Sequence, residues 1–316
     1  MDAAPRITAP RRHARRGPFW AAIGVALWAA ALPGHAQRSA PPDEPAAPSG
    51  TLPIGHGVYL VRGRANATFV VGSSGVMLID TMTPGNGALL RQSIAAVTPL
   101  PIACVINTHF HLDHTGSNAT FGALHVPIIA QANVLRRVSM STQNVRGETI
   151  APAPAAARPT ATFAEHKRVQ CGGVRARLVH LPHAHTDGDL YVWLPAQDVL
   201  VSGDVAKTDE YPFWDAGNGG TLAGTLAGIR RILARMDAQT VLLPGHGGPG
   251  DRRRLQVYLA MMERTRDTVA ALKRRGESVD AVLARRLLAS DRSAGEDGPD
   301  FRDLFVRAVY ESPLAP

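Results

Sequence analysis

The 316-residue sequence is poor in aromatic residues, which make up 5% of it, and it has only two cysteines. Its longest apolar segment, Phe19 to Leu32, is shorter than the roughly 20 residues that a membrane-spanning helix needs. It has no Gly-x-Ser-x-Gly segment, so a serine hydrolase has no support. Gly217–Gly220 lacks the Lys-Ser/Thr that follows in a phosphate-binding loop. Hydrophobic residues nevertheless make up 45% of the chain, which predicts a folded protein with a substantial core.

The first 36 residues have the composition of a secretory signal peptide. Met1–Arg16 carries five arginines, the apolar segment follows, and Pro33–Ala36 ends in a small residue. This order predicts cleavage after about Ala36 and an exported, periplasmic protein without a stable membrane span. A membrane anchor is the alternative. Residues 37–50, rich in proline and alanine, are expected to form a disordered linker.

The net charge of +8 overstates the basic character of the folded part. Residues 1–36 contain five arginines and one aspartate, so the remainder has 29 basic and 25 acidic residues and a net charge of +4. A modest charge without a basic stripe argues against a nucleic-acid partner and leaves a small-molecule substrate as the expected partner. No feature of the sequence indicates an oligomeric state.

The two cysteines lie in different contexts. Cys104 belongs to an apolar segment typical of a buried strand, whereas Cys171 stands beside two glycines in a turn. Export would permit a disulfide. Because bridge geometry is strict and the sequence does not give their separation, we do not expect these cysteines to pair.

The remainder divides into two similar halves of short apolar strands followed by a helix. Strands are expected at 58–61, 68–71, 76–79, 103–106, 175–181, 190–194, 199–201 and 240–243, and helices at 88–97 and 222–236. This rhythm predicts an α/β protein with two packed sheets and helices outside. Between the halves, the proline-rich residues 139–162 are expected to form a surface linker or lid. Residues 251–316 are expected to form three helices packed on the core, at 252–275, 278–289 and 301–310.

Four potential metal ligands fall within six positions of the segment Asn107–Gly116. These are His109, His111, Asp113 and His114, which follow an apolar strand directly. Imidazole nitrogens and carboxylate oxygens are the usual ligands of catalytic zinc. The alternative, a polar surface loop, is a poor explanation for so dense a cluster, so we interpret this segment as metal-binding.

Three further ligand-type residues also follow apolar strands. They are His185, Asp204, which ends Ser-Gly-Asp, and His246, which ends Pro-Gly-His. Strand ends at one edge of a sheet converge. Because seven ligands exceed what one tetrahedral zinc ion needs, the sequence predicts two Zn²⁺ ions per chain.

In order and spacing, these motifs resemble those of the metallo-β-lactamase superfamily. The resemblance covers about residues 55–250 and implies an αββα sandwich within a domain at 51–250. It implies that the first metal is held by His109, His111 and His185, the second by Asp113, His114 and His246, and that Asp204 bridges both. It also implies that Asp80 supports the metal loop from outside. A helix N-cap is the other interpretation of Asp80.

The residue at position 204 narrows the resemblance to particular groups within the superfamily. Zinc β-lactamases typically carry Cys or Ser where this chain has Asp204, whereas an aspartate resembles glyoxalase II, lactonases and other dinuclear hydrolases. The segment after Asp204 lacks the Gly-Cys-Gly-Arg type sequence of glyoxalase II, which counts against a glutathione thioester as substrate.

The resemblance implies a hydrolase in which a hydroxide bridging the metals attacks a lactone, ester, thioester or related carbonyl bond. Asp113 is the expected catalytic residue, because it could orient the hydroxide. The alternatives are a β-lactamase, a mononuclear iron oxygenase and a non-catalytic periplasmic binding protein. Tyr211, Phe213 and Trp214 either pack in the core or line the substrate pocket. For Tyr211 we expect a substrate-binding role.

Overall fold

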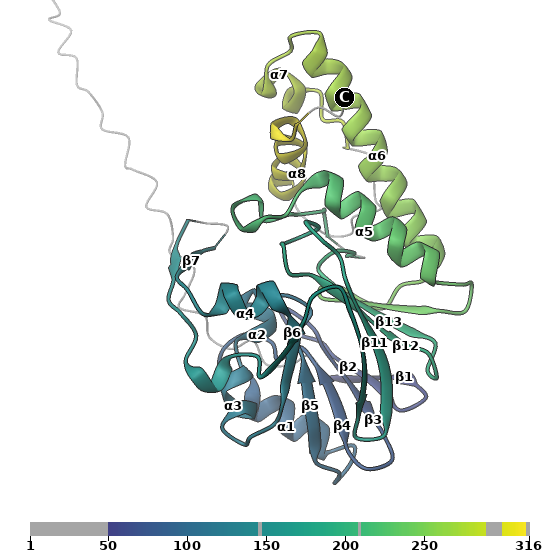
Figure 1. Cartoon of the computed structure of the whole chain (residues 1–316). Coiled ribbons are helices and arrows are strands. Elements are labelled where there is room, and N and C mark those ends of the chain that lie inside the picture. Colours follow the sequence, from purple (N-terminus) through teal and green to yellow (C-terminus); the bar gives the residue numbers. More distant parts are fainter. Residues whose placement is uncertain (1–49, 145–146, 208–209, 289–298, 314–316) are drawn as a thin grey trace, which may run out of the picture. The chain divides into compact units, whose positions relative to one another are not determined.

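The computed structural model describes residues 50–144, 147–207, 210–288 and 299–313. Within them, two β-sheets pack face to face with helices on their outer faces (Figure 1). This confirms the predicted αββα sandwich. The expected signal peptide lies outside the described residues, as does all of the expected linker except Gly50.

The first sheet has seven strands in the order β1-β2-β3-β4-β5-β6-β9. Its strands are β1 (Thr51–Gly55), β2 (Val58–Val61), β3 (Ala67–Val71), β4 (Val76–Ile79), β5 (Ile102–Ile106), β6 (Ile128–Gln131) and β9 (Ala161–Phe163). The strands from β1 to β4 pair antiparallel, and those from β4 to β9 pair parallel. The crossovers carry α1 (Gly87–Ala95), α2 (Leu112–Thr115), α3 (Asn118–Gly122) and α4 (Ala132–Val138).

The second sheet has five strands in the order β10-β11-β12-β13-β14. They are β10 (His166–Cys171), β11 (Val174–His180), β12 (Leu190–Leu194), β13 (Val199–Gly203) and β14 (Val241–Pro244). The last two are parallel and are connected through α5 (Leu222–Arg235). Their carboxyl ends therefore lie at the same edge of the sheet.

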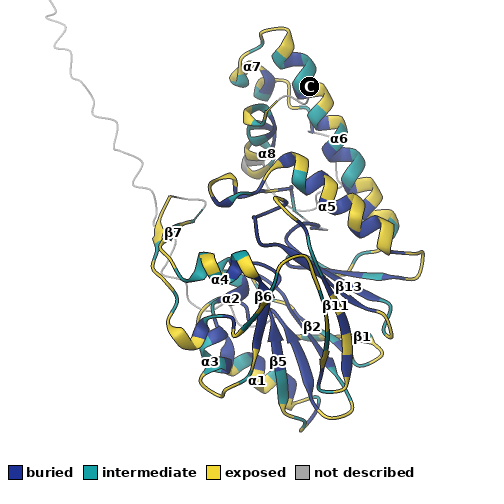
Figure 2. Ribbon diagram, viewed as in Figure 1, coloured by how far each residue is buried: buried dark blue, intermediate teal, exposed yellow. Residues whose placement is uncertain are grey.

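Three apolar clusters fill the spaces between these layers. One lies between the sheets and contains Leu60, Ile106, Leu178 and Val192, all fully buried. A second lies under α1 and α3 on the first sheet. The third joins the second sheet to α5 and to the C-terminal helices α6 (Arg252–Arg274), α7 (Val279–Ala284) and α8 (Pro299–Glu311). Figure 2 shows the buried strands between partly exposed helices. The C-terminal helices thus pack on the core, as expected.

The expectation that the cysteines do not pair is wrong. Cys104 of β5 and Cys171 of β10 form a disulfide with their Cα atoms 6.2 Å apart. The bridge joins the two sheets across the interior. The strand-and-turn pattern places each cysteine in its own element, but the packing of one sheet on the other decides their distance.

The excursion at residues 139–162 is more ordered than its composition suggests. It contains the short hairpin β7–β8 (Thr142–Gln143 and Thr149–Ile150) and a 3₁₀ turn (Ala155–Ala157), and it leads into strand β9 at the edge of the first sheet. Backbone pairing with β6, which is a long-range contact, turns this proline-rich segment into part of the sheet.

Among the described residues, no helix is long and apolar enough to cross a membrane.

Candidate metal centre

The ligand-rich segment lies at the carboxyl end of β5. The chain leaves the strand at Ile106 and begins the short helix α2 after His111. His109 and His111 therefore stand in the loop, and Asp113 and His114 in the first turn of the helix.

The other three residues come from strand ends of the second sheet. His185 lies in the turn between β11 and β12, Asp204 follows β13, and His246 follows β14. Two glycines permit this approach. Gly203 has a φ of 53°, and a Cβ on Gly245 would lie 2.1 Å from Asp204 Oδ1.

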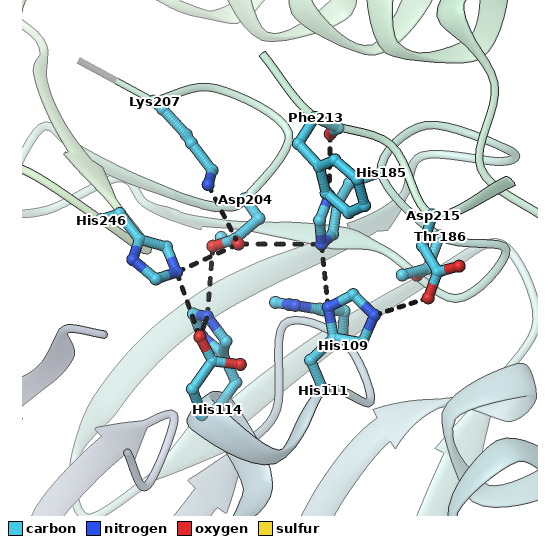
Figure 3. Close-up of polar contacts among 12 residues, drawn as sticks. His109, His111, His114, His185, Thr186, Asp204, Lys207, Phe213, Asp215 and His246 are labelled. Carbon is cyan, nitrogen blue, oxygen red and sulfur yellow. Dashed lines mark hydrogen bonds and ion pairs between the residues drawn. The ribbon is translucent and has the colours of Figure 1, made fainter. Parts of the chain in front are cut away.

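The structure brings all seven residues together in three overlapping groups (Figure 3). Within each group, the ligand atoms lie within 4.8 Å of one another. The groups are His109, His111 and His185; Asp113, His114 and His246; and His109, His114 and Asp204. The first two are the sets that the resemblance implies for the two metals. We call them the first and the second half of the centre.

Asp204 lies between the two halves. Its Oδ1 is 3.2 Å from His114 Nε2, and its Oδ2 is 3.2 Å from His246 Nε2 and 3.7 Å from His185 Nε2. Its position is that of a ligand shared by two metals.

The buried polar atoms at the centre fit metal ions. Among the described residues, His109 Nε2 is buried without a hydrogen-bond partner, and His114 Nε2 and Asp204 Oδ1 are buried facing each other at 3.2 Å. Such atoms are rare in native proteins because their desolvation costs free energy. Bound cations would satisfy them, and a set of imidazoles and carboxylates suits zinc. The residues present therefore fit bound metal ions.

Each histidine of the centre is held at its other ring nitrogen. These outer contacts are His109 Nδ1 with Thr108 Oγ1 (3.1 Å), His111 Nε2 with Asp215 Oδ2 (2.9 Å), His114 Nδ1 with Asp80 Oδ2 (2.9 Å), His185 Nδ1 with the Phe213 carbonyl (2.9 Å) and His246 Nδ1 with Glu210 Oε1 (3.5 Å). Such partners orient ligating histidines and set their tautomers. Each imidazole is thus aimed with one nitrogen toward the centre.

Asp80 is one of these outer partners, as the resemblance implied. Its carboxylate also accepts hydrogen bonds from the Thr108 backbone N–H (2.8 Å) and hydroxyl (2.7 Å). It does not cap the following helix, whose N-cap is Asn86. Its φ of 61° and its 2% exposure show a residue held tightly in place.

The two halves differ in their electrostatics. Burial lowers the pKa of His185 to about 3 and the pKa of His109 well below its usual value. Burial is the largest single influence on His246 and lowers its pKa, but Asp204 and Asp113 together outweigh it and raise the pKa of His246 to about 9. Asp204, Asp113 and Asp80 together likewise raise the pKa of His114 against burial. In the absence of metal, His109 and His185 of the first half are therefore neutral, whereas His114 and His246 of the second half are protonated.

The family model described as the metallo-beta-lactamase superfamily matches residues 60–246, more than half of the chain. The chain belongs to this superfamily. The match begins in β2 and ends at His246, so it includes all seven candidate ligands.

Two named relatives are enzymes with different activities. Over 195 residues, the chain is 29% identical to a hydroxyacylglutathione hydrolase of Rhodospirillum rubrum, covering 60% of this chain and 61% of the relative. Over 237 residues, it is 25% identical to the 2,4-dinitroanisole O-demethylase subunit alpha of a Nocardioides species, covering 73% of this chain and 67% of the relative.

Solved structures of the superfamily share the fold. A metallo-beta-lactamase from Pontibacter korlensis has a TM-score of 0.55 at 21% identity, covering 67% of this chain and 98% of that one. The sec-alkylsulfatase Pisa1 from a Pseudomonas species has a TM-score of 0.60 at 20% identity, covering 83% of this chain and 50% of that one. At these identities the likeness supports the fold alone.

Sequence reasoning did not identify several charged residues around the candidate metal centre of this chain. Asp215 and Glu210 hold ligands, and the buried Lys207 places Nζ 3.8 Å from Asp204 Oδ2 and 2.7 Å from Glu210 Oε2. The only signal in the sequence is the concentration of charged residues in the segment that follows Asp204. Without the path of this loop, nothing distinguishes them from surface charges.

The aromatic residues of the same loop divide between two roles. Tyr211 is 9% exposed and stacks on Phe305 of α8, with 6.1 Å between ring centroids, so it packs in the core and the substrate-binding role expected for it is not supported. Trp214 packs edge-on against the same Phe305. Phe213 is 36% exposed, and its ring lies against the His185 imidazole at 5.6 Å. Phe213 is therefore the aromatic residue of this loop that lies beside the centre.

A hydrogen-bond network ties this loop to the rest of the fold. The Asn218 side chain donates to Asp215 Oδ2 (2.7 Å) and to the Gln143 carbonyl of β7 (3.0 Å), and accepts from Arg137 of α4 (3.0 Å). Arg137 also pairs with Asp187 at 2.8 Å. The outer partner of His111 is thus held from two other segments.

Proposed function

We propose that this chain is an exported, zinc-dependent hydrolase that cleaves a lactone, ester, thioester or related carbonyl bond. The observation that carries the proposal is the pair of ligand sets with Asp204 between them. Two ions 3.5–4 Å apart characterise many hydrolytic sites in proteins. A binding protein would not need so complete a set of ligands and outer partners.

The ligand sets would hold one zinc at His109, His111 and His185 and another at Asp113, His114 and His246. Bound zinc lowers the pKa of water to about 7 and so supplies a hydroxide nucleophile at neutral pH. The chain orients the ligands through Asp80 and Asp215, which fix the imidazoles. No nucleophilic side chain is required.

Asp113 is the proposed catalytic residue among the ligands. Its side chain is 29% exposed, far more than the 4% of Asp204, and its Oδ2 lies 3.2 Å from His246 Nε2. It is therefore the carboxylate of the centre that substrate and water can reach. In this position it can orient the attacking water and accept a proton from it.

Asp204 and the loop after it restrict the range of substrates. Asp204 stands where zinc β-lactamases carry Cys or Ser, so we expect weak or no β-lactam hydrolysis. Hydroxyacylglutathione hydrolase is among the relatives, but the Val205–Trp214 segment lacks the sequence expected for glutathione thioesters. Esters and lactones are therefore the first substrates to test.

The experiment is a substrate panel assayed with purified protein before and after chelation, together with elemental analysis. We expect about two zinc ions per chain and hydrolysis that chelation abolishes and added zinc restores. One tightly bound iron without zinc would favour an oxygenase instead. Metal binding without turnover of any ester, lactone, thioester or β-lactam would favour a binding protein.

Export is tested separately. The Arg-rich start, the apolar segment and Pro33–Ala36 motivate it, and the sheet-to-sheet disulfide suits an oxidising compartment. N-terminal sequencing of protein from its native compartment should begin near Gln37. Mature cytoplasmic protein that retains Met1 would contradict export.

A further inference from the structure

A cavity of about 1390 Å³ lies between the loop that follows β13 and the helices α5, α6 and α8. It borders the first half of the metal centre, because Phe213 and Asp215 line it and also contact His185 and His111. Neither the ligand sets nor the proposed hydrolysis accounts for this cavity. Its size and its closeness to the centre suit the part of a substrate that does not react.

The wall formed by α5 changes from apolar to charged with distance from the centre. Leu222, Leu226 and Arg230 line the cavity at four-residue spacing, so they lie on one face of the helix. Leu222 directly follows the loop and is buried, as is Leu226, whereas half of the Arg230 side chain is exposed. At 1.5 Å per residue, Arg230 lies about 12 Å along the helix from Leu222.

The wall formed by α6 repeats this spacing. Arg266, Ala270 and Arg274 line the cavity from one face, and the small Ala270 leaves room between two arginines. Arg230 pairs with Glu263, and Arg266 with Asp267. Arg274 forms no ion pair with any residue that the structure describes. Asp267 and Glu311 also line the cavity, and Asp267 is already paired with Arg266. Arg274 is therefore the arginine of this wall that is available to a ligand.

We propose that this cavity binds an elongated apolar chain of the substrate that ends in an anionic group, such as a carboxylate. The apolar chain would lie along Phe213, Leu226 and Val309, and the anionic end would meet Arg274. This assignment rests on the proposed hydrolase function and adds to it a substrate class: carbonyl compounds of long-chain acids with a charged end. Arginine is suited to bind a carboxylate through two hydrogen bonds.

Three para-nitrophenyl esters test this assignment: the acetate, the octanoate, and the mono-ester of octanedioic acid, which adds a terminal carboxylate. For the wild type, kcat/KM should rise in that order. The Ala270→Phe substitution fills the cavity and should lower the octanoate-to-acetate ratio of kcat/KM about tenfold. Arg274→Ala should lower the octanedioate-to-octanoate ratio roughly fivefold, the factor that corresponds to an exposed charge pair.

Arg275→Ala is the matched control for Arg274→Ala. Arg275 is the next residue along the chain, 66% exposed, and it does not line the cavity. Both ratios should equal those of the wild type in this variant. Calorimetric binding of octanedioate to the full chain gives a second readout that needs no turnover, and Arg274→Ala should weaken it by a similar factor.

The outcomes separate the cavity from the reaction. If the esters are hydrolysed with equal kcat/KM and Ala270→Phe changes no ratio, the cavity assignment is overturned while the hydrolase stands. If no ester is hydrolysed but octanedioate binds and Arg274→Ala weakens that binding, the cavity assignment is supported and the hydrolase is not. Equal effects of Arg274→Ala and Arg275→Ala would also overturn the assignment.

Discussion

The two halves of the metal centre follow one plan but are supported differently. Each half takes two ligands from the segment after β5 and one from the second sheet. The main support of the second half is Asp80, at the end of a central strand. The first half depends on Asp215 and the Phe213 carbonyl, in the long loop between β13 and α5.

The two ligand sets are therefore alike in composition of segments, but the outer residues that hold their histidines belong to different kinds of structure. Asp80 directly follows β4, which pairs with a strand on each side, and its N–H donates to the Ile106 carbonyl of β5 (2.8 Å). Asp215 lies in an irregular loop, where its N–H donates to the His185 carbonyl (2.7 Å) and its carboxylate accepts from the Asn218 side chain (2.7 Å). The halves also differ in charge, since the pKa of His185 in the first half is lowered and that of His246 in the second half is raised. Some changes to the chain should therefore affect both halves together, and others mainly one of them.

The largest expected effect comes from the disulfide, because both halves take ligands from both sheets. The bridge closes a loop of 67 residues, for which chain entropy gives about 4 kcal/mol of stability. The double variant Cys104→Ala, Cys171→Ala should lose about that much free energy of unfolding in denaturant titration. Reduction of the wild type, which keeps the cysteine volume, is the control and should reproduce most of the loss. An unchanged midpoint would show that the sheets hold together without the bridge.

Removing the shared ligand should disable both halves. Asp204→Asn keeps the shape but weakens the contacts to His114, His246 and His185. We expect kcat/KM to fall by more than the roughly 100-fold that loss of an outer partner costs, with loss of bound zinc. Asp198→Asn, in the turn before the same strand, is the control and should keep both metals. Full zinc content in Asp204→Asn would exclude a bridging role.

Removing the outer partner of one half at a time should separate the affinities of the two metals. Asp215→Ala should weaken the first metal 10–100-fold, and Asp80→Ala should weaken the second by a similar factor, as expected for outer partners. Asp80→Ala should have a smaller effect on the first metal, because Asp80 also holds Thr108, the outer partner of His109. Chelator competition yields the two dissociation constants. Asp80→Ala should also lower the free energy of unfolding by about 3 kcal/mol, because it leaves the buried donors of Thr108 and His114 unpaired. Equal loss of both metals in both variants would contradict the division into halves.

The sequence predicted which seven residues come together, because each signal is local. All seven follow a short apolar strand, and the parallel strands β13 and β14 bring Asp204 and His246 to one edge of the sheet. Asp80 was identified for the same reason, at the end of the apolar segment Val76–Ile79. Strand patterns and their ends therefore predicted the fold and the group of residues that the structure brings together.

The features that sequence reasoning missed depend on contacts between distant segments. The path of an irregular loop decides that Asp215 meets His111, a residue 104 positions away. The packing of α8 decides that Tyr211 stacks on Phe305. The disulfide depends in the same way on how one sheet lies on the other. None of these distances is encoded in a local pattern.

The smallest expected effect is a difference between the halves in their response to pH. Zinc binds neutral imidazole, so a protonated histidine must release its proton first. In the first half, the pKa of His185 is about 3 and that of His109 is also lowered, so neither carries a proton to displace between pH 6 and 9. In the second half, His246 has a pKa of about 9 and the pKa of His114 is also raised.

The affinity of the second metal should therefore rise with pH, by about tenfold per unit for each displaced proton, until His246 is neutral above about pH 9. The affinity of the first metal should change much less over the same range. Chelator competition at pH 6, 7, 8 and 9 gives both constants, and calorimetry in buffers of different ionisation enthalpy counts the released protons. The expected result is one tightly bound zinc at pH 6 and two at pH 9. Two constants that shift in parallel would show that Asp204 couples the halves so strongly that they titrate as one site.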